Sequence, residues 1–169
     1  IEHLKFELNV TAITGAKGEY LGNSLEWQDV TAARAQADRA IRLQGAVDQS
    51  GTAQVMVDRD LIITYANTAT LTLLKGHEET FQKKYPGFVA SESALIGTCI
   101  DVFHKDPSHQ RKLLSDPKNL PWKTDIQIEH LSFELNVTAV MDGDGAYVGN
   151  SLEWKDVTDA RAQADKATR

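Results

Sequence analysis

Residues 128–169 read IEHLSFELNVTAVMDGDGAYVGNSLEWKDVTDARAQADKATR, and residues 1–42 read IEHLKFELNVTAITGAKGEYLGNSLEWQDVTAARAQADRAIR. The two segments align without a gap at a constant offset of 127 residues, and roughly 30 of the 42 aligned positions are identical. A period of this length is too long for a solenoid repeat and has the size of a whole domain. The sequence therefore indicates one complete copy of a domain, preceded by the last part of another copy.

The repeated segment predicts a β-hairpin. Residues 133–139 alternate apolar and polar side chains, which is the period of a half-buried strand. A glycine-rich turn at 141–145 leads into a return strand at 147–157. Residues 123–131 alternate in the same way just before the hairpin. Together these segments predict a three-stranded antiparallel meander.

The complete copy opens with a different pattern. Residues 52–57 and 61–66 are rich in β-forming side chains and are joined by a short acidic turn. Asn67 stands where a helix N-cap belongs, before a helical segment at 68–75. Residues 76–119 mix short helical pieces with glycine and proline. This order predicts an α+β fold, with a five-stranded antiparallel sheet and short helices across one face.

Composition is that of an ordinary soluble domain, with 41% apolar and 25% charged residues. The net charge of −6 without a basic cluster argues against a nucleic-acid partner. A single cysteine, Cys99, excludes a disulfide framework and favours a reducing, cytoplasmic compartment. The sequence contains no phosphate-binding loop, catalytic triad pattern or metal-ligand cluster, so we expect a protein that is not an enzyme.

The repeat divides the chain into four expected segments. Residues 1–31 are the C-terminal strands of a preceding, truncated copy, and 32–47 are a helical linker. Residues 48–158 are the complete domain, and 159–169 start an exit helix. The linker is either a solvated connector or a weak coiled-coil seam that brings two chains together. Residues 1–31 duplicate strands of the complete domain and could take their place in the sheet of a second chain. We therefore also expect a homodimer, in which strand exchange by this segment is one route of assembly.

Two motifs resemble one family. Asp156-Val157-Thr158, repeated at Asp29-Val30-Thr31, resembles the Asp-Ile/Val-Thr that ends PAS domains and starts their signalling helix. Residues 100–114 read IDVFHKDPSHQRKLL and resemble the haem-binding PAS domains of oxygen-sensing chemoreceptors, or aerotaxis transducers, which carry Phe-His-x-x-Pro-x-His-Gln-Arg. The resemblance covers about residues 46–160 and implies the PAS fold within a tandem-PAS methyl-accepting chemotaxis protein.

The resemblance implies a b-type haem and a sensor of oxygen or another diatomic gas. In that family the histidine of the motif, here His104, ligates the iron. A tryptophan on the last strand, here Trp154, donates a hydrogen bond to the bound gas, and a leucine on the preceding strand, here Leu135, lines the distal side. Leu152 shares the face of Trp154, so the pattern gives one N–H donor in an apolar pocket. Signalling to adjacent PAS domains and a downstream chemoreceptor domain would follow the last strand into the helix.

Plainer interpretations of the same residues remain open. A strand tryptophan is often only core, and His109 is expected to cap or pack the helix that follows it. His77 is expected to be exposed to solvent. The alternative functions are a PAS domain that binds a flavin or a small organic ligand, and a cofactor-free PAS domain that serves dimerisation and relay.

Overall fold

The computed structural model of the chain describes residues 3–167, so the ends of the first and last expected segments, residues 1–2 and 168–169, lie outside the described residues. The chain divides into two compact units, of which the first runs to Val47 and the second begins at Asp48. No helix within residues 3–167 is long and apolar enough to cross a lipid bilayer.

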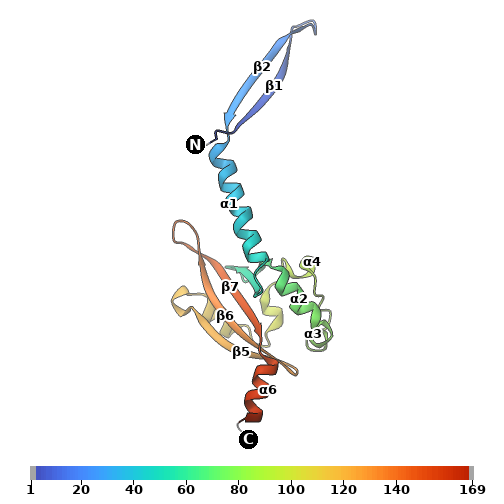
Figure 1. The fold of residues 1–169 in the computed structure, drawn as a ribbon, viewed down its shortest axis with the longest axis vertical. Helices are drawn as coiled ribbons and strands as arrows, with labels where there is room; N and C mark the ends of the chain where they lie inside the picture. The colour runs from blue at the N-terminus through green and yellow to red at the C-terminus, as the bar shows by residue number, and fades with distance from the viewer. Residues whose placement is uncertain (1–2, 168–169) are drawn as a thin grey trace. The chain divides into compact units, whose positions relative to one another are not determined.

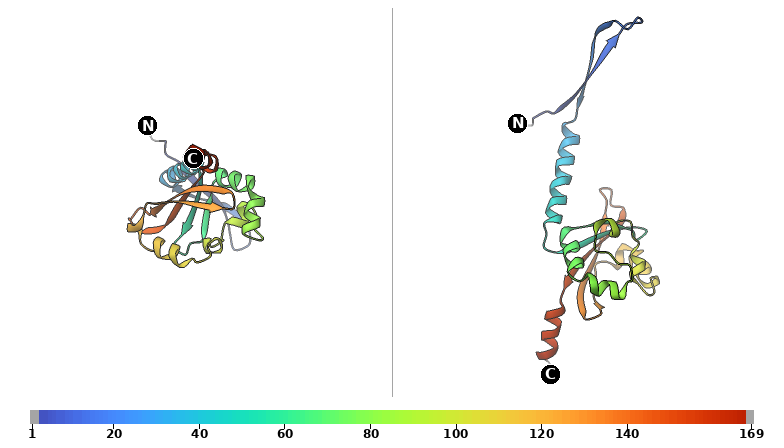
Figure 2. Two further views of the ribbon diagram at one scale, coloured as in Figure 1. Left: turned by 90° about the horizontal axis from the view of Figure 1, so that it is seen from below. Right: turned by 90° about the vertical axis from the view of Figure 1, so that its right-hand side faces the viewer.

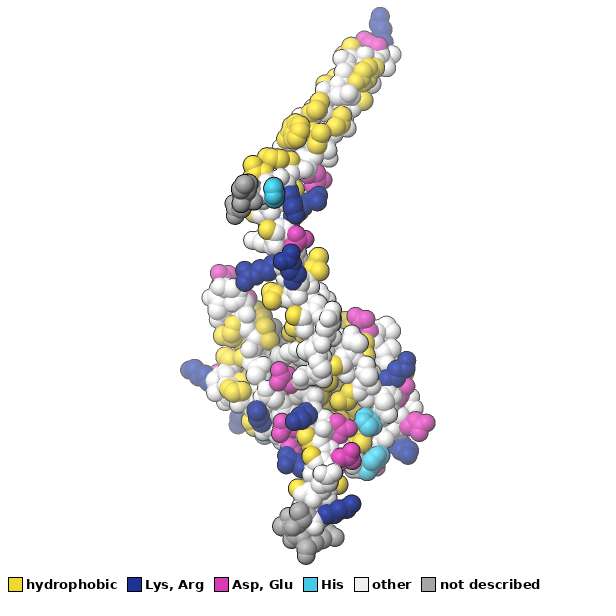
Figure 3. Space-filling view, viewed as in Figure 1, with side chains coloured by type: hydrophobic (Ala, Val, Ile, Leu, Met, Phe, Trp, Pro, Cys, Tyr) yellow, Lys and Arg dark blue, Asp and Glu magenta, His cyan; other side chains and the backbone are white. Residues whose placement is uncertain are grey.

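The first unit is a hairpin followed by a helix. Strands β1 (Phe6–Thr14) and β2 (Tyr20–Asp29) pair antiparallel, and α1 (Thr31–Asp48) follows. The register sets Leu8 opposite Trp27, yet these side chains are 42% and 64% exposed. Figure 3 shows hydrophobic side chains at the surface along this hairpin. The alternation that would bury one face is present, but no core of this unit covers it.

The second unit holds a five-stranded antiparallel sheet with strand order β4-β3-β7-β6-β5. Its elements are β3 (Ala53–Asp58), β4 (Ile63–Ala66), α2 (Thr68–Gly76), α3 (Glu78–Lys84), α4 (Glu92–Leu95), η1 (Ile100–Phe103), α5 (Ser108–Leu114), η2 (Pro117–Asn119), β5 (Trp122–Ile128), β6 (Leu131–Met141), β7 (Tyr147–Asp156) and α6 (Thr158–Ala167). Two strands, a series of short helices and three strands follow one another along the chain (Figure 1).

One face of this sheet forms the core. In β3 every second residue is buried, and the buried residues of β6 follow the same parity at Phe133 and Val137. The short helices gather on that side of the strands (Figure 2). The predicted α+β fold, with a five-stranded antiparallel sheet and helices on one face, is therefore confirmed.

Two strand boundaries differ from the expected ones because each lies at a turn with a positive φ. Glu129 takes a positive φ of 55° and starts a tight turn, so Leu131 pairs with Ile128 as the first residue of β6. Leu61 takes a φ of 65°. The preceding Asp58 carboxylate accepts backbone N–H bonds from the turn, and β4 begins only after this turn. Positive φ at residues other than glycine is uncommon, and the alternating pattern gave no sign of it.

The N-cap predicted at Asn67 is confirmed and does more than cap α2. Its Oδ1 accepts hydrogen bonds from the backbone N–H of Thr70 and of Gln54, at 3.0 and 2.9 Å. Its Nδ2 donates to the carbonyl of Thr52 at 2.9 Å. Asn67 is fully buried. This side chain therefore joins the start of α2 to strand β3 and holds that end of the helix against the sheet.

Candidate functional site

The sheet register brings three of the predicted site residues together. Leu135 on β6 lies directly opposite Trp154 on β7, and Leu152 lies opposite Val137 two pairs further along. On its other side Trp154 pairs with Ala53 of β3, which is buried. Trp154, Leu135 and Leu152 therefore share the inner face of the sheet, as the parity of the two strands predicts.

Trp154 places a polar atom, its indole Nε1, among the apolar side chains on the inner face of the sheet. Its ring meets the Phe133 ring edge to face, with centroids 6.0 Å apart. Its Nε1 atom is buried and has no hydrogen-bond partner within the part of the chain that the structure describes. An indole N–H can only donate, and leaving such a donor buried and unpaired costs about 1–3 kcal/mol. The site thus holds one donor that lacks an acceptor.

His104 lies in the loop between η1 and α5 and is partly buried. Its Nδ1 is 2.8 Å from the carbonyl oxygen of Ile100. A carbonyl can only accept, so Nδ1 donates this bond, and the tautomer that it favours has its lone pair on Nε2. Metal-ligating histidines are typically held in this way, with the other ring nitrogen bonded to a backbone carbonyl or a carboxylate. The backbone N–H of His104 also donates to Asp101, which holds the loop.

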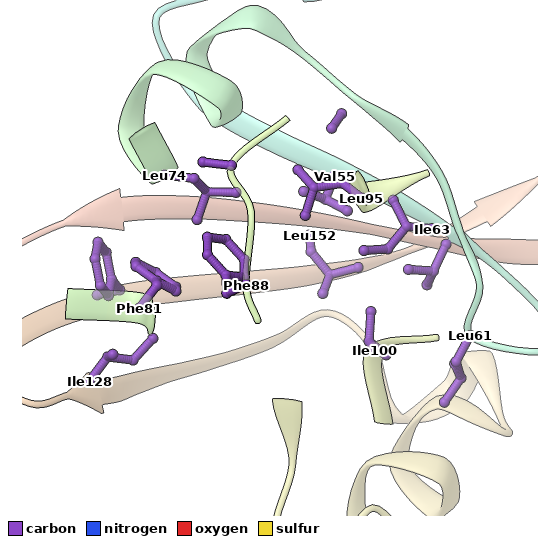
Figure 4. Packing of buried hydrophobic residues seen from close by; sticks show 14 of the residues in the cluster. Val55, Leu61, Ile63, Leu74, Phe81, Phe88, Leu95, Ile100, Ile128 and Leu152 are labelled. Carbon is purple, nitrogen blue, oxygen red and sulfur yellow. The ribbon is translucent and has the colours of Figure 1, made fainter. Parts of the chain in front are cut away.

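Aromatic side chains occupy the interior between Trp154 and the His104 loop. Phe133 contacts Phe81 of α3 with ring centroids 6.1 Å apart, and Phe81 stacks on Phe88 at 5.1 Å. Phe88 in turn meets Phe103, the residue before His104, at 6.2 Å. Figure 4 shows Phe81 and Phe88 side by side above the sheet. Sequence reasoning missed these rings, although Phe81 is the one apolar residue in the helix EETFQKK.

The structure does not bring His104 and Trp154 into contact. Among residues 3–167, a cavity of about 360 Å³ lies beside the His104 loop and is lined by Tyr85, Phe88 and Phe103 among others. A larger open groove of about 860 Å³ is lined by Trp154 together with α2 and residues 48–53. Neither hollow includes both predicted site residues, and the aromatic rings stand between them.

The end of β7 forms a polar junction with the last helix. The Asp156 Oδ1 atom accepts hydrogen bonds from the backbone N–H and the hydroxyl of Thr158, at 2.9 and 2.6 Å. His77 Nε2 lies 3.2 Å from Asp156 Oδ2. Burial alone would raise the pKa of Asp156, but the Thr158 hydrogen bonds and His77 outweigh it and lower that pKa below its ordinary value.

Two histidine predictions can be compared with these positions. His77 was expected to be exposed to solvent; its side chain is 32% exposed, and it also bonds to Asp156, a contact that was not expected. His109 lies within α5, the helix that it was expected to cap or pack, and its ring meets that of Trp122 on β5 with centroids 6.3 Å apart. The roles assigned to His104, Trp154, Leu135 and Leu152 stay predictions.

The described residues contain no cluster of three or more histidine, cysteine or acidic side chains able to hold a metal ion. A haem differs in this respect, because the porphyrin supplies four of the ligands and the protein can supply a single axial histidine. The absence of such a cluster therefore does not test the roles predicted for His104 and Trp154.

Known proteins resemble this chain in sequence and in fold. No protein-family model matches it. The methyl-accepting chemotaxis protein McpB of Pseudomonas aeruginosa is 32% identical over 118 residues, which is 70% of this chain and 17% of McpB. The chain thus spans only a small part of that relative.

Solved structures of PAS proteins also resemble this chain. The Aer2 receptor of Vibrio cholerae, a dual PAS-heme oxygen sensor, matches with a TM-score of 0.61 and 41% identity over 63% of this chain and 95% of that one. A PAS domain from Colwellia psychrerythraea shares the fold, with a TM-score of 0.52 and 21% identity over 71% of this chain and 98% of that one. The chain belongs to the PAS domain family, in the group found in chemotaxis receptors.

Proposed function

We propose that this PAS domain binds a b-type haem and senses oxygen or another diatomic gas for a chemotaxis receptor. The observation that carries the proposal is the buried Trp154 Nε1, an N–H donor without an acceptor on an apolar wall opposite Leu135. A diatomic ligand with partial negative charge would supply the missing acceptor, and the surrounding apolar side chains would keep water away from it.

His104 is the residue proposed to hold the haem iron. The Ile100 carbonyl favours the tautomer with the lone pair on Nε2, so Nε2 is available as a neutral imidazole ligand. When bound, the haem would supply the binding position for the gas. The chain has no C-x-x-C-H sequence, so the haem would be held without covalent attachment. The similarity to the Aer2 PAS-heme sensor supports this choice over a flavin or another organic ligand.

The proposed signal leaves the site along β7. Trp154 lies two residues before Asp156, and Asp156 caps the first turn of α6. In a tandem-PAS receptor this helix would lead to the next PAS domain or to the signalling domain. We propose a cytoplasmic, non-enzymatic sensory module that acts as a homodimer.

One observation favours the cofactor-free alternative, in which the domain serves dimerisation and relay only. Phe133 is fully buried and Phe81 is 3% exposed, so the rings between Trp154 and the His104 loop already fill the interior. A haem would require these rings to move. The relay interpretation requires no such movement.

Absorption spectroscopy separates these functions. The purified chain is mixed with haemin, reduced with dithionite and titrated with carbon monoxide. The proposal expects a Soret band that shifts with carbon monoxide, and His104→Ala should lose the axial-histidine spectrum. His109→Ala, five residues further on, is the matched control and should keep it. An unchanged spectrum in His104→Ala together with a loss in His109→Ala would show that His109, and not His104, ligates the iron. The absence of a Soret band in the wild type would favour the relay function.

A further inference from the structure

The junction between the last strand and the helix is built in the same way in both copies of the repeat. Asp29 Oδ1 accepts the N–H of Thr31 at 2.9 Å, and Asp156 Oδ1 accepts the N–H of Thr158 at 2.9 Å. In both copies the threonine hydroxyl oxygen also accepts a backbone N–H from the first strand of the hairpin or the residue before it, from Lys5 in the first copy and from Ser132 in the second. The first copy has no core around it. The capped junction therefore forms from the repeated segment alone.

The second copy adds one contact that the first copy lacks. His77 Nε2 lies 3.2 Å from Asp156 Oδ2, the carboxylate oxygen that the Thr158 cap leaves available. For Asp29, Thr31 is the only partner that lowers the pKa, whereas for Asp156 His77 contributes as well. The contact joins residues 79 positions apart in sequence.

His77 lies at the junction between α2 and α3, two of the short helices that pack on the sheet. It follows α2 and precedes α3, and its backbone N–H caps the carbonyls of the last turn of α2. Its ring meets Phe133 edge to face, with centroids 6.2 Å apart. Phe133 is the cross-strand partner of Asp156 and also contacts Trp154. His77 therefore touches both the ring beside the candidate ligand site and the carboxylate that starts α6.

We propose that His77 is the positioning residue that couples the ligand site to the exit helix. A ligand that shifts Trp154 shifts Phe133, and His77 passes this displacement to the second oxygen of Asp156. Of the charged groups around the imidazole, Asp156 faces it, while Glu78, the next residue in the chain, bonds instead to the backbone N–H of Ala90. The signalling role rests on the proposed function, but the mechanical link does not.

Amide hydrogen exchange measured by NMR tests the link in the full chain. The reporters are the amides of Thr158 and Arg161 at the start of α6, and the internal controls are the equivalent amides of Thr31 and Arg34 in the first copy. The variant His77→Phe keeps a ring against Phe133 and removes the bond to Asp156. The variant His77→Gln keeps a side-chain N–H that can reach the carboxylate.

In His77→Phe we expect exchange at Thr158 and Arg161 to become about three- to tenfold faster, the effect of one lost hydrogen bond, with Thr31 and Arg34 unchanged. His77→Gln should restore most of the protection. Unchanged exchange at the start of α6 in His77→Phe would overturn the proposal. Faster exchange throughout β3–β7 would overturn it as well, because His77 would then be a general stability residue.

The coupling is measured in the same samples with haemin, dithionite and carbon monoxide. In the wild type we expect carbon monoxide to change exchange at Thr158 by at least about twofold. His77→Phe should keep the shifted Soret band but lose this response. A response of wild-type size in His77→Phe refutes the coupling role. If no haem is taken up, the proposed function fails, and the haem-free exchange comparison still decides whether the link exists.

Discussion

Replacing Trp154 by phenylalanine separates a ligand donor from a simple core residue. Phenylalanine keeps a ring against Phe133, removes the indole N–H that lacks an acceptor, and is smaller than the indole. In the ligand-free protein that buried N–H costs about 1–3 kcal/mol, which offsets the packing lost with the smaller ring. We therefore expect the free energy of unfolding of Trp154→Phe to stay within about 1 kcal/mol of the wild-type value.

The ligand-bound protein should respond in the opposite way. A hydrogen bond to an acceptor with negative charge contributes about 1.5–3 kcal/mol, which corresponds to about a 10- to 150-fold faster loss of oxygen in Trp154→Phe. Urea unfolding of the haem-free chain and stopped-flow oxygen dissociation, followed at the Soret band, measure the two effects. Trp122→Phe is the matched control and should leave oxygen dissociation unchanged.

Either of two results would refute this role of the indole N–H. Oxygen dissociation at the wild-type rate in Trp154→Phe would show that the indole N–H meets no ligand. A loss of more than about 2 kcal/mol of stability in the haem-free variant would show that the whole indole is needed for packing.

Three further predictions concern the framework. The folded-state pKa of Asp156 is lowered from 3.8, so its contribution to stability is present above that value and lost as the pH falls through the lowered pKa. Urea titrations should therefore show a difference in unfolding free energy between wild type and Asp156→Asn that is full at neutral pH and disappears in acid. Asn67→Ala should lose about 2 kcal/mol or more in the same assay, since it leaves buried backbone groups unpaired, and a loss below about 0.5 kcal/mol would contradict this. Gly149→Ala should lower the melting temperature because its Cβ would meet the Val57 carbonyl oxygen, whereas Gly143→Ala has open space and should melt like the wild type.

The parts of the structure that follow from short-range pattern could be predicted from the sequence. Alternation along β7 indicates which side chains share a face, so Leu152 was predicted on the same face as Trp154, whereas Leu135 was placed near it by the family resemblance. The Asp-Val-Thr motif likewise predicts its own cap, because donor and acceptor are two residues apart.

Contacts between distant segments could not be predicted in this way. The bond from His77 to Asp156 spans 79 residues, and a single histidine after a helix gives no sign of its partner. The stacking of Phe81 on Phe88 depends on how α3 and the loop after it fold back over the sheet. The turn at Glu129 requires a positive φ that the sequence does not signal with glycine or asparagine.

The junction between the last strand and the helix makes its hydrogen bonds within the repeated segment, and this bears on how the segment can be duplicated. The hairpin strands pair with each other and the Asp-Thr cap lies within the repeated segment, so a second copy needs no partner elsewhere for these hydrogen bonds. The longest run of differences between the two copies lies at the hairpin tip, residues 13–17 against 140–144. Gly18 and Gly145 are retained there with φ of 82° and 80°. The tip is therefore free to change its chemistry, provided that one glycine continues to reverse the chain.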